Sequence, residues 1–169
     1  MEDVKANNES SSSEASNELL QLVGFQLGNE EYGIDILKVQ EINRIAEITR
    51  IPQSPDFVEG VINLRGNVIP IIDLRKRFNM PEREHDKQTR IVVGEIEGRT
   101  VGLIVDAVSE VIRLPLNTIE PPPPIVSDEH SAYISGVGKL DDRLLMLLDI
   151  DKILTGPDKE KVFEMSTEA

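Results

Sequence analysis

Residues 33–45 have the sequence GIDILKVQEINRI, and residues 102–114 have the related sequence GLIVDAVSEVIRL, at an offset of 69 residues. The alignment pairs a glycine, several aliphatic residues, a glutamate and an arginine in the two stretches. A second match follows in the same order, where GVINLRGNVIPIIDL (60–74) aligns with GVGKLDDRLLMLLDI (136–150) at an offset of 76. Two matches in one order and at similar spacing predict an internal duplication.

The duplication separates positions that serve the fold from positions that serve a site. Glu41 aligns with Glu110, and Arg44 aligns with Arg113. We expect shared positions to maintain a common scaffold, whereas a site should lie where the copies differ.

Short strands and tight turns are predicted along most of the chain. VINLR (61–65) and VIPIIDL (68–74) flank Gly66-Asn67, two residues that tolerate the positive φ angles of a hairpin turn. Further turns are predicted at Glu97-Gly98 and Asp141-Asp142. About ten short strands in two sets of five predict an all-β protein of two small barrels.

The remaining segments complete this outline. Continuous apolar runs at 68–72 and 144–148 indicate strands buried on both faces, so we expect the two halves to share a core. KVQEI (38–42) is predicted to be a short helical turn. Residues 1–18 form an acidic, Ser-rich tail that we expect to be disordered, and residues 155–169 form a helical tail.

Composition limits the functions open to the chain. It has no cysteine, which excludes disulfides, thiolate metal sites and a cysteine nucleophile. Its net charge of −13 argues against binding to nucleic acid or anionic lipid. No apolar run is long enough to cross a bilayer and no signal peptide is evident, so we expect a cytoplasmic protein without direct membrane insertion. The one basic cluster, Arg75-Lys76-Arg77, is predicted to be a solvated turn.

No catalytic constellation or metal site is apparent in the sequence. Gly138-Lys139 lacks the other residues of a phosphate-binding loop, and the only histidines, His85 and His130, lie in polar loops. This pattern favours a binding module without a cofactor over an enzyme.

One enzymatic alternative rests on Asp73 and Asp149, which end the matched strands of the two copies. The two carboxylates could meet across an internal symmetry axis and serve a small hydrolase. A raised carboxylate pKa would favour this hypothesis. Capping is the simpler role, because each aspartate also precedes a helix-like segment.

Three segments closely resemble the CheW family of bacterial chemotaxis coupling proteins: EEYGIDILKVQEI (30–42), FVEGVINLRGNVIPIIDLRKRF (57–78) and VGLIVDAVSEVI (101–112). The resemblance extends over about residues 19–154. It implies two intertwined five-stranded SH3-like β-barrels with short helices at the C-terminus. We expect the first barrel at about 32–88 and the second at about 19–31 plus 89–150, with strand exchange between them left open.

The resemblance also implies a function and partners. Members of the family are non-enzymatic scaffolds that link methyl-accepting chemoreceptors to the histidine kinase CheA. They contact the cytoplasmic tip of the receptor and the regulatory domain of the kinase, and they are recruited to membrane-associated signalling arrays. No cofactor or metal is implied.

The family's binding residues map onto named positions of this sequence. The positions that match the receptor-binding groove are Val39, Glu41, Gly60, Arg65, Ile91 and Val111. Those that match the kinase contacts are Thr49 and Val68 in the first barrel and Pro124 and Ile125 in the second.

A physical interpretation accompanies these assignments. Aliphatic side chains can line a trench for a helical receptor tip. Glu41 and Arg65 carry opposite charges, and we expect them to pair and to hold the shape of the groove. The alternative is two solvated charges that contribute little.

Overall fold

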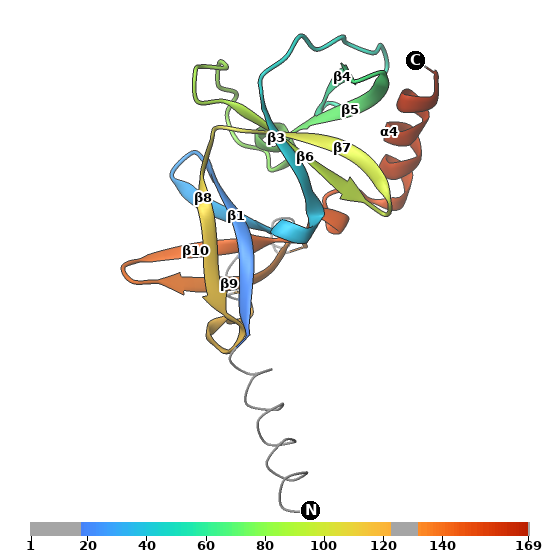
Figure 1. Cartoon of the computed structure of the whole chain (residues 1–169). Coiled ribbons are helices and arrows are strands. Elements are labelled where there is room, and N and C mark those ends of the chain that lie inside the picture. Colours follow the sequence, from blue (N-terminus) through green and yellow to red (C-terminus); the bar gives the residue numbers. More distant parts are fainter. Residues whose placement is uncertain (1–17, 123–131, 169) are drawn as a thin grey trace, which may run out of the picture.

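The computed structural model describes residues 18–122 and 132–168. Residues 1–17 of the predicted tail, as well as Pro124, Ile125 and His130, lie outside the described residues. The described part forms two packed β-sheets, with a C-terminal helix covering one of them (Figure 1).

Ten strands form two five-stranded sheets. Sheet A has the order β8-β1-β2-β10-β9 and contains β1 (Leu19–Leu27), β2 (Glu30–Asp35), β8 (Ala107–Pro115), β9 (Ile134–Leu140) and β10 (Arg143–Leu148). Sheet B has the order β3-β6-β7-β5-β4 and contains β3 (Val39–Arg44), β4 (Val58–Leu64), β5 (Asn67–Asp73), β6 (Arg90–Ile96) and β7 (Arg99–Val105). The helical elements are η1 (Ile36–Lys38), α2 (Leu74–Arg77), η2 (Leu116–Thr118), η3 (Ile150–Lys152) and α4 (Gly156–Glu168).

Each sheet takes strands from both copies of the repeat. Sheet A joins β1 and β2 of the first copy to β8, β9 and β10 of the second, and sheet B has the converse composition. The copies meet in two parallel pairs, with Ile71 opposite Gly102 and Leu147 opposite Gly33. These two contacts are equivalent in the repeat, because Leu147 corresponds to Ile71 at the offset of 76 and Gly102 corresponds to Gly33 at the offset of 69. The sheets are therefore intertwined, as the family resemblance implied.

The boundaries between the two units differ from the predicted ones. Sheet B occupies residues 39–105 rather than about 32–88, because β2 pairs with β1 and the β6–β7 hairpin pairs with β3 and β5. The repeated stretch that begins at Gly33 is the cause. It contains the passage from one sheet to the other, through η1 in the first copy and through Asp106 in the second.

In each sheet, a backbone bridge links the segment that follows one edge strand to the opposite edge strand. The segment after β3 bridges β4, where Thr49 and Val61 exchange two hydrogen bonds of 2.9 Å. At the equivalent place in sheet A, Glu120 and Val137 exchange hydrogen bonds of 2.9 and 2.7 Å. Both sheets therefore curl until their edges are linked, which is consistent with barrels.

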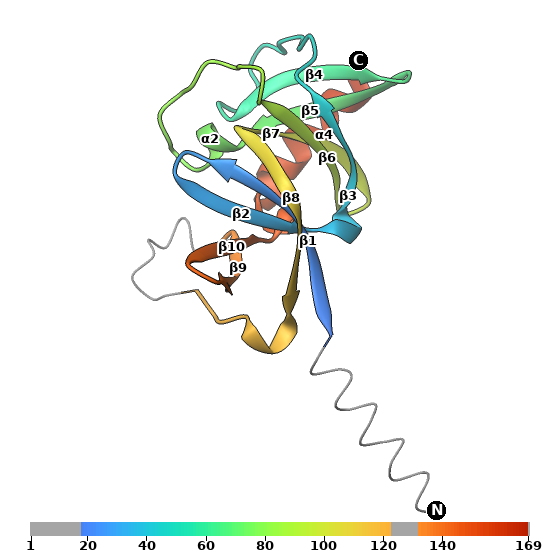
Figure 2. The ribbon, with the colours of Figure 1, turned by 60° about the vertical axis from the view of Figure 1, so that its left-hand side comes forward.

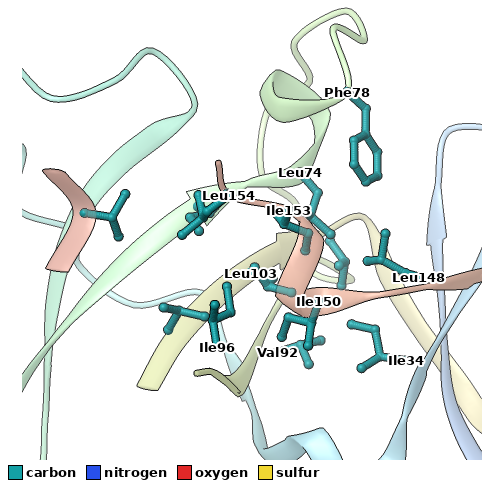
Figure 3. Close-up of a cluster of buried hydrophobic side chains, with 14 of the residues drawn as sticks. Ile34, Leu74, Phe78, Val92, Ile96, Leu103, Leu148, Ile150, Ile153 and Leu154 are labelled. Carbon is teal, nitrogen blue, oxygen red and sulfur yellow. The ribbon is translucent and has the colours of Figure 1, made fainter. Parts of the chain in front are cut away.

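The core has three parts. The largest cluster is shared, as predicted, with Phe25 and Ile34 of sheet A packed with Val92 and Leu103 of sheet B; Figure 3 shows many of its side chains. Each sheet also encloses a smaller cluster of its own, around Ile91 in sheet B and around Leu22 in sheet A.

Two local predictions are wrong, and a third is confirmed. The first hairpin turn is Arg65-Gly66 rather than Gly66-Asn67, with φ values of 51° and 87°. KVQEI lies mostly in strand β3 and not in a helical turn, because its side chains alternate in exposure against β6. The C-terminal helix is confirmed, with Gly156 and Pro157 in its first turn, where proline is tolerated.

Candidate protein-interaction site

The predicted groove residues lie on several elements. Val39 and Glu41 are on β3, Gly60 on β4, Arg65 in the β4–β5 turn, Ile91 on β6 and Val111 on β8. All except Val111 belong to sheet B or to its turns.

Glu41 and Arg65 form the expected ion pair. Arg65 Nη2 lies 2.5 Å from Glu41 Oε2, and Asn43 Nδ2 donates a hydrogen bond of 2.8 Å to Glu41 Oε1. The hydrogen bonds from Arg65 and then from Asn43 lower the pKa of Glu41 below its ordinary value. The Arg65 side chain is 70% exposed and that of Glu41 is 25% exposed, so the pair lies at the surface. A pair so exposed contributes little to the stability of the fold.

Two other groove residues are structural in this conformation. Ile91 is fully buried inside sheet B, in the cluster with Ile71 and Val93. Gly60 has a φ of 147°, and a β-carbon there would lie 2.1 Å from the carbonyl oxygen of Thr49. Gly60 therefore permits the bridge that links the edges of sheet B, and neither residue offers a side chain to a partner.

The register of the edge strands places aliphatic residues of both copies on comparable faces. Ile42 lies opposite Val92, and Val111 lies opposite Val23. Directly opposed residues share a face, so Ile42 and Val111 project from the sides of their sheets that carry the shared core. Ile42 and Val111 are both exposed, although the residues opposite them, Val92 and Val23, are buried.

We call this area the edge-strand surface and define it by the following residues on β3 and β8: Val39, Ile42, Arg44, Val108, Val111 and Arg113. The first three are the repeat equivalents of the last three. Val39 and Val108 are partly buried against the shared core and anchor the surface to it. Figure 2 shows both edge strands near the junction of the two sheets.

The functional assignment from sequence did not include Ile42 or Leu37. Leu37 lies on η1 between the sheets and, at 88%, is the most exposed large hydrophobic side chain of the described residues. The alignment of Ile42 with Val111 was the signal that could have identified Ile42. Leu37 aligns with Asp106, so this position is one where the copies differ.

Thr49 and Val68, the two described residues that were predicted to contact the kinase, lie close together on sheet B. Thr49 bridges Val61, and Val68 lies opposite Asn63 on the neighbouring strand. Because positions 61 and 63 share a face of β4, Thr49 and Val68 flank that strand on the same face. The side chain of Thr49 is exposed, whereas Val68 packs partly against the shared core.

The basic cluster is not the solvated turn that the sequence predicted. Arg75, Lys76 and Arg77 form most of α2, and all three side chains are largely buried. Arg75 pairs with Asp106 and Lys76 pairs with Glu59. The prediction failed because these acidic partners are remote in sequence.

Arg77, the third member of the cluster, has aromatic and backbone partners. Its guanidinium lies 4.8 Å from the ring centre of Phe57 and 4.9 Å from that of Tyr133. Its Nε donates a hydrogen bond of 2.6 Å to the carbonyl oxygen of Ile153. Arg77 therefore ties α2 to segments of both sheets and to the chain before α4.

Asp73 and Asp149 cap helices, and the hydrolase alternative is not supported. Asp73 accepts a hydrogen bond from Arg75 N at 2.9 Å, and Asp149 accepts one from Asp151 N at 3.1 Å. Burial raises the pKa of Asp73, with a smaller contribution from Glu59. This raised pKa alone does not identify a catalytic pair, because each carboxylate is engaged at the start of its own helical segment.

Two further features are absent from the described part of the chain. Among these residues, no group of three or more His, Cys, Asp or Glu side chains is placed to hold a metal ion. No helix within the same ranges has the length and apolar character needed to span a bilayer.

Comparisons with known proteins agree with this architecture. The family model for the CheW-like domain matches residues 21–158. A chemotaxis protein CheW of Klebsiella aerogenes is 46% identical over 134 residues, which cover 79% of this chain and 81% of the relative. One of Helicobacter pylori is 40% identical over 144 residues, covering 85% and 87% of the two chains.

A solved structure gives the same result. The scaffolding protein TtCheW from Thermoanaerobacter tengcongensis is 45% identical and superposes with a TM-score of 0.77. The match covers 83% of this chain and 96% of that one. The similarity therefore extends over both sheets.

Proposed function

The chain belongs to the CheW family and is a chemotaxis coupling adaptor, and we propose that it links methyl-accepting receptors to the histidine kinase CheA without catalytic activity of its own. In this role it is recruited to membrane-associated receptor arrays. The observation that carries the proposal is the presence of two distinct candidate contact surfaces on one small chain, the edge-strand surface and the face around Thr49 and Val68.

The edge-strand surface suits a receptor tip. A helical partner requires an apolar strip with polar groups that fix its register. Ile42 and Val111 supply exposed aliphatic side chains, and the Glu41–Arg65 pair supplies polar groups on the other face of the edge strand β3. The exposed leucine on η1, Leu37, adds apolar area at the junction of the sheets.

The face around Thr49 suits the kinase. It lies along β4 at the linked edge of sheet B, on a different strand from the aliphatic residues of the edge-strand surface. Single substitutions can therefore weaken the binding of one partner without affecting the binding of the other. Pro124 and Ile125 remain candidates for a second kinase contact, outside the described residues.

Reconstitution tests the proposal. Purified protein, a receptor cytoplasmic fragment and the kinase are combined, and co-sedimentation and kinase autophosphorylation are measured. We expect Val111→Asp to reduce sedimentation with the receptor, and Thr49→Lys to reduce kinase binding while receptor binding persists. Leu144→Asp, at an exposed leucine on β10, is the matched control for receptor binding. An unmodified protein that neither sediments with its partners nor changes autophosphorylation would overturn the proposal.

The Glu41–Arg65 pair offers a sharper test of the receptor surface. Arg65→Glu places two carboxylates together, and we expect it to abolish receptor binding. The double change Glu41→Arg/Arg65→Glu restores opposite charges and should recover part of the binding. If the double variant binds no better than the worse single variant, the pairing does not shape the surface.

A further inference from the structure

Three arginines on or beside the edge-strand surface have no acidic partner within the described residues. Arg44 on β3, Arg90 on β6 and Arg113 on β8 take part in no ion pair there, although many other cations of the described chain do. Unpaired cations are available to an anionic group from outside the chain.

Two of these arginines face each other directly. Arg44 and Arg90 are opposed in the antiparallel register of β3 and β6. Like charges at directly opposed positions destabilise a sheet. Arg90 Nη1 donates hydrogen bonds to the carbonyl oxygens of Lys87 and Thr89, at 2.8 and 2.9 Å, which fix the guanidinium without neutralising it. The register thus places two arginines directly opposite each other, and backbone carbonyl oxygens hold the guanidinium of one of them.

The internal repeat places an arginine at the same position on the other edge strand. Arg113 is the equivalent of Arg44, and each lies two residues beyond the exposed aliphatic residue of its strand. Side chains two apart on a strand share a face, so each arginine projects beside its aliphatic neighbour. From the junction of the sheets, β3 and β8 run in opposite directions (Figure 1). The cations therefore flank the central aliphatic residues on two opposite sides.

We propose that the edge-strand surface selects a helix whose apolar stripe is flanked at both ends by carboxylates. Arginine suits this role because its planar guanidinium binds carboxylate in a bidentate manner. The inference rests on the proposed function and specifies the chemistry of the receptor segment that this chain accepts. The aliphatic residues hold the stripe, and the paired Arg44 and Arg90 provide the more positive of the two ends.

The test uses two matched receptor cytoplasmic fragments. One is unmodified, and in the other the Asp and Glu residues of the tip are replaced by Asn and Gln. Association rates with the full-length protein are measured over a series of salt concentrations. We expect the unmodified fragment to associate about tenfold faster at low salt, because charges at the rim of an interface act mainly on association. The difference should disappear at high salt.

Charge reversal in this chain completes the test. Arg44→Glu/Arg113→Glu should remove the preference for the acidic fragment. Arg50→Glu/Lys161→Glu changes the net charge by the same amount at two exposed cations elsewhere and should leave the preference intact. Thermal unfolding of Arg90→Val checks the like-charge argument, since its midpoint should equal or exceed that of the unmodified protein.

The outcomes separate this inference from the function on which it rests. If the unmodified protein binds the fragment but the Arg44/Arg113 variant retains the full acidic preference, the inference fails and the adaptor function stands. If the unmodified protein binds neither fragment, both the adaptor function and the inference fail.

Discussion

Two ion pairs lie where the chain passes from one sheet to the other, and they differ in burial. In the second copy, β7 passes to β8 through Asp106, which accepts hydrogen bonds from Arg75 Nε and Nη2 at 2.7 and 2.6 Å and from Gly28 N at 2.8 Å. We call this group, Asp106, Arg75 and Gly28, the buried clamp. The side chains of Asp106 and Arg75 are only 9% and 13% exposed.

The corresponding passage in the first copy runs from β2 to β3 through η1. Here Lys38 Nζ lies 3.3 Å from Asp151 Oδ2, and Asp151 Oδ1 accepts a hydrogen bond of 3.4 Å from Glu97 N. We call this group, Lys38, Asp151 and Glu97, the exposed clamp, because its ion-pair side chains are 45% and 37% exposed. Glu97 is the repeat equivalent of Gly28, and Asp151 that of Arg75.

The comparison shows that the two passages lie at equivalent places in the repeat but use charges of opposite sign. The helical segment after the last strand of each copy supplies a cation in one clamp and an anion in the other. The passage between sheets supplies the opposite charge in each case. A buried bidentate pair fixes one passage firmly, whereas a solvated pair leaves the other less constrained.

Replacing the glycine at each linked sheet edge should give the largest difference in unfolding free energy between the two copies. Gly60→Ala places a β-carbon 2.1 Å from the Thr49 carbonyl oxygen at a φ of 147°, and we expect a loss of about 3 kcal/mol or more. In Gly136→Ala the nearest atom is a side-chain methyl of Ile119 at 2.8 Å, which can move, so we expect about 1 kcal/mol. Denaturant unfolding of both variants measures the difference, and equal losses would show that the edges are equally tight.

The buried clamp should give the next largest effect. Asp106→Asn removes the charge that opposes Arg75 and weakens the hydrogen bonds that the carboxylate accepts, at an expected cost of about 2–3 kcal/mol. The free energy of unfolding gives the value. Asp151→Asn is the matched change in the exposed clamp, and an equal loss there would contradict the distinction.

Acid should weaken the buried clamp. Burial alone would raise the pKa of Asp106, but hydrogen bonds from Arg75 and Gly28 outweigh it and lower the pKa below its ordinary value. A lowered folded pKa stabilises the fold above the ordinary carboxyl pKa of about 4, and this contribution is lost as the pH falls through the folded pKa. The stability gap between the unmodified protein and Asp106→Asn should therefore narrow below about pH 4.

Asp73 provides a control of opposite sign for this pH dependence. Burial raises its pKa, so protonation favours the folded state as the pH falls through the folded pKa. Compared with Asp73→Asn, the unmodified protein should gain relative stability on acidification. Parallel pH curves for both pairs of proteins would contradict these two assignments.

The smallest effect is expected in the exposed clamp. Lys38→Met removes a surface ion pair and should cost less than about 1 kcal/mol. The unfolding midpoint in denaturant should therefore change little, and raising the salt concentration should make the difference smaller. A loss as large as that of Asp106→Asn would show that the two passages are constrained alike.

Sequence reasoning predicted the strands better than their partners. The repeat and the turn residues indicated ten strands, and the opposite charges of Glu41 and Arg65 indicated their pair. Which hairpin joins which sheet depends on parallel contacts such as Ile71 with Gly102, and local periodicity carries no information about them. The unit boundaries were misplaced for this reason.

Burial was harder to predict for single side chains. Ile91 was assigned to a groove, yet it alternates into the interior of sheet B. Arg75 was expected to lie in solvent. That prediction failed because its partner, Asp106, lies on an element that is remote in sequence. An aliphatic residue or a run of cations has the same local appearance in either environment, and only the assembled sheets decide between them.

The nested order of the strands has a consequence during synthesis on the ribosome. Sheet B uses only β3 to β7, a continuous segment, so it can assemble as soon as β7 has emerged. Strands β1 and β2 are made first, but β2 must wait for β10, the last strand, to fill its second edge. The oldest part of the nascent chain therefore exposes an unpaired strand for longest, and premature termination would leave that strand available for aggregation.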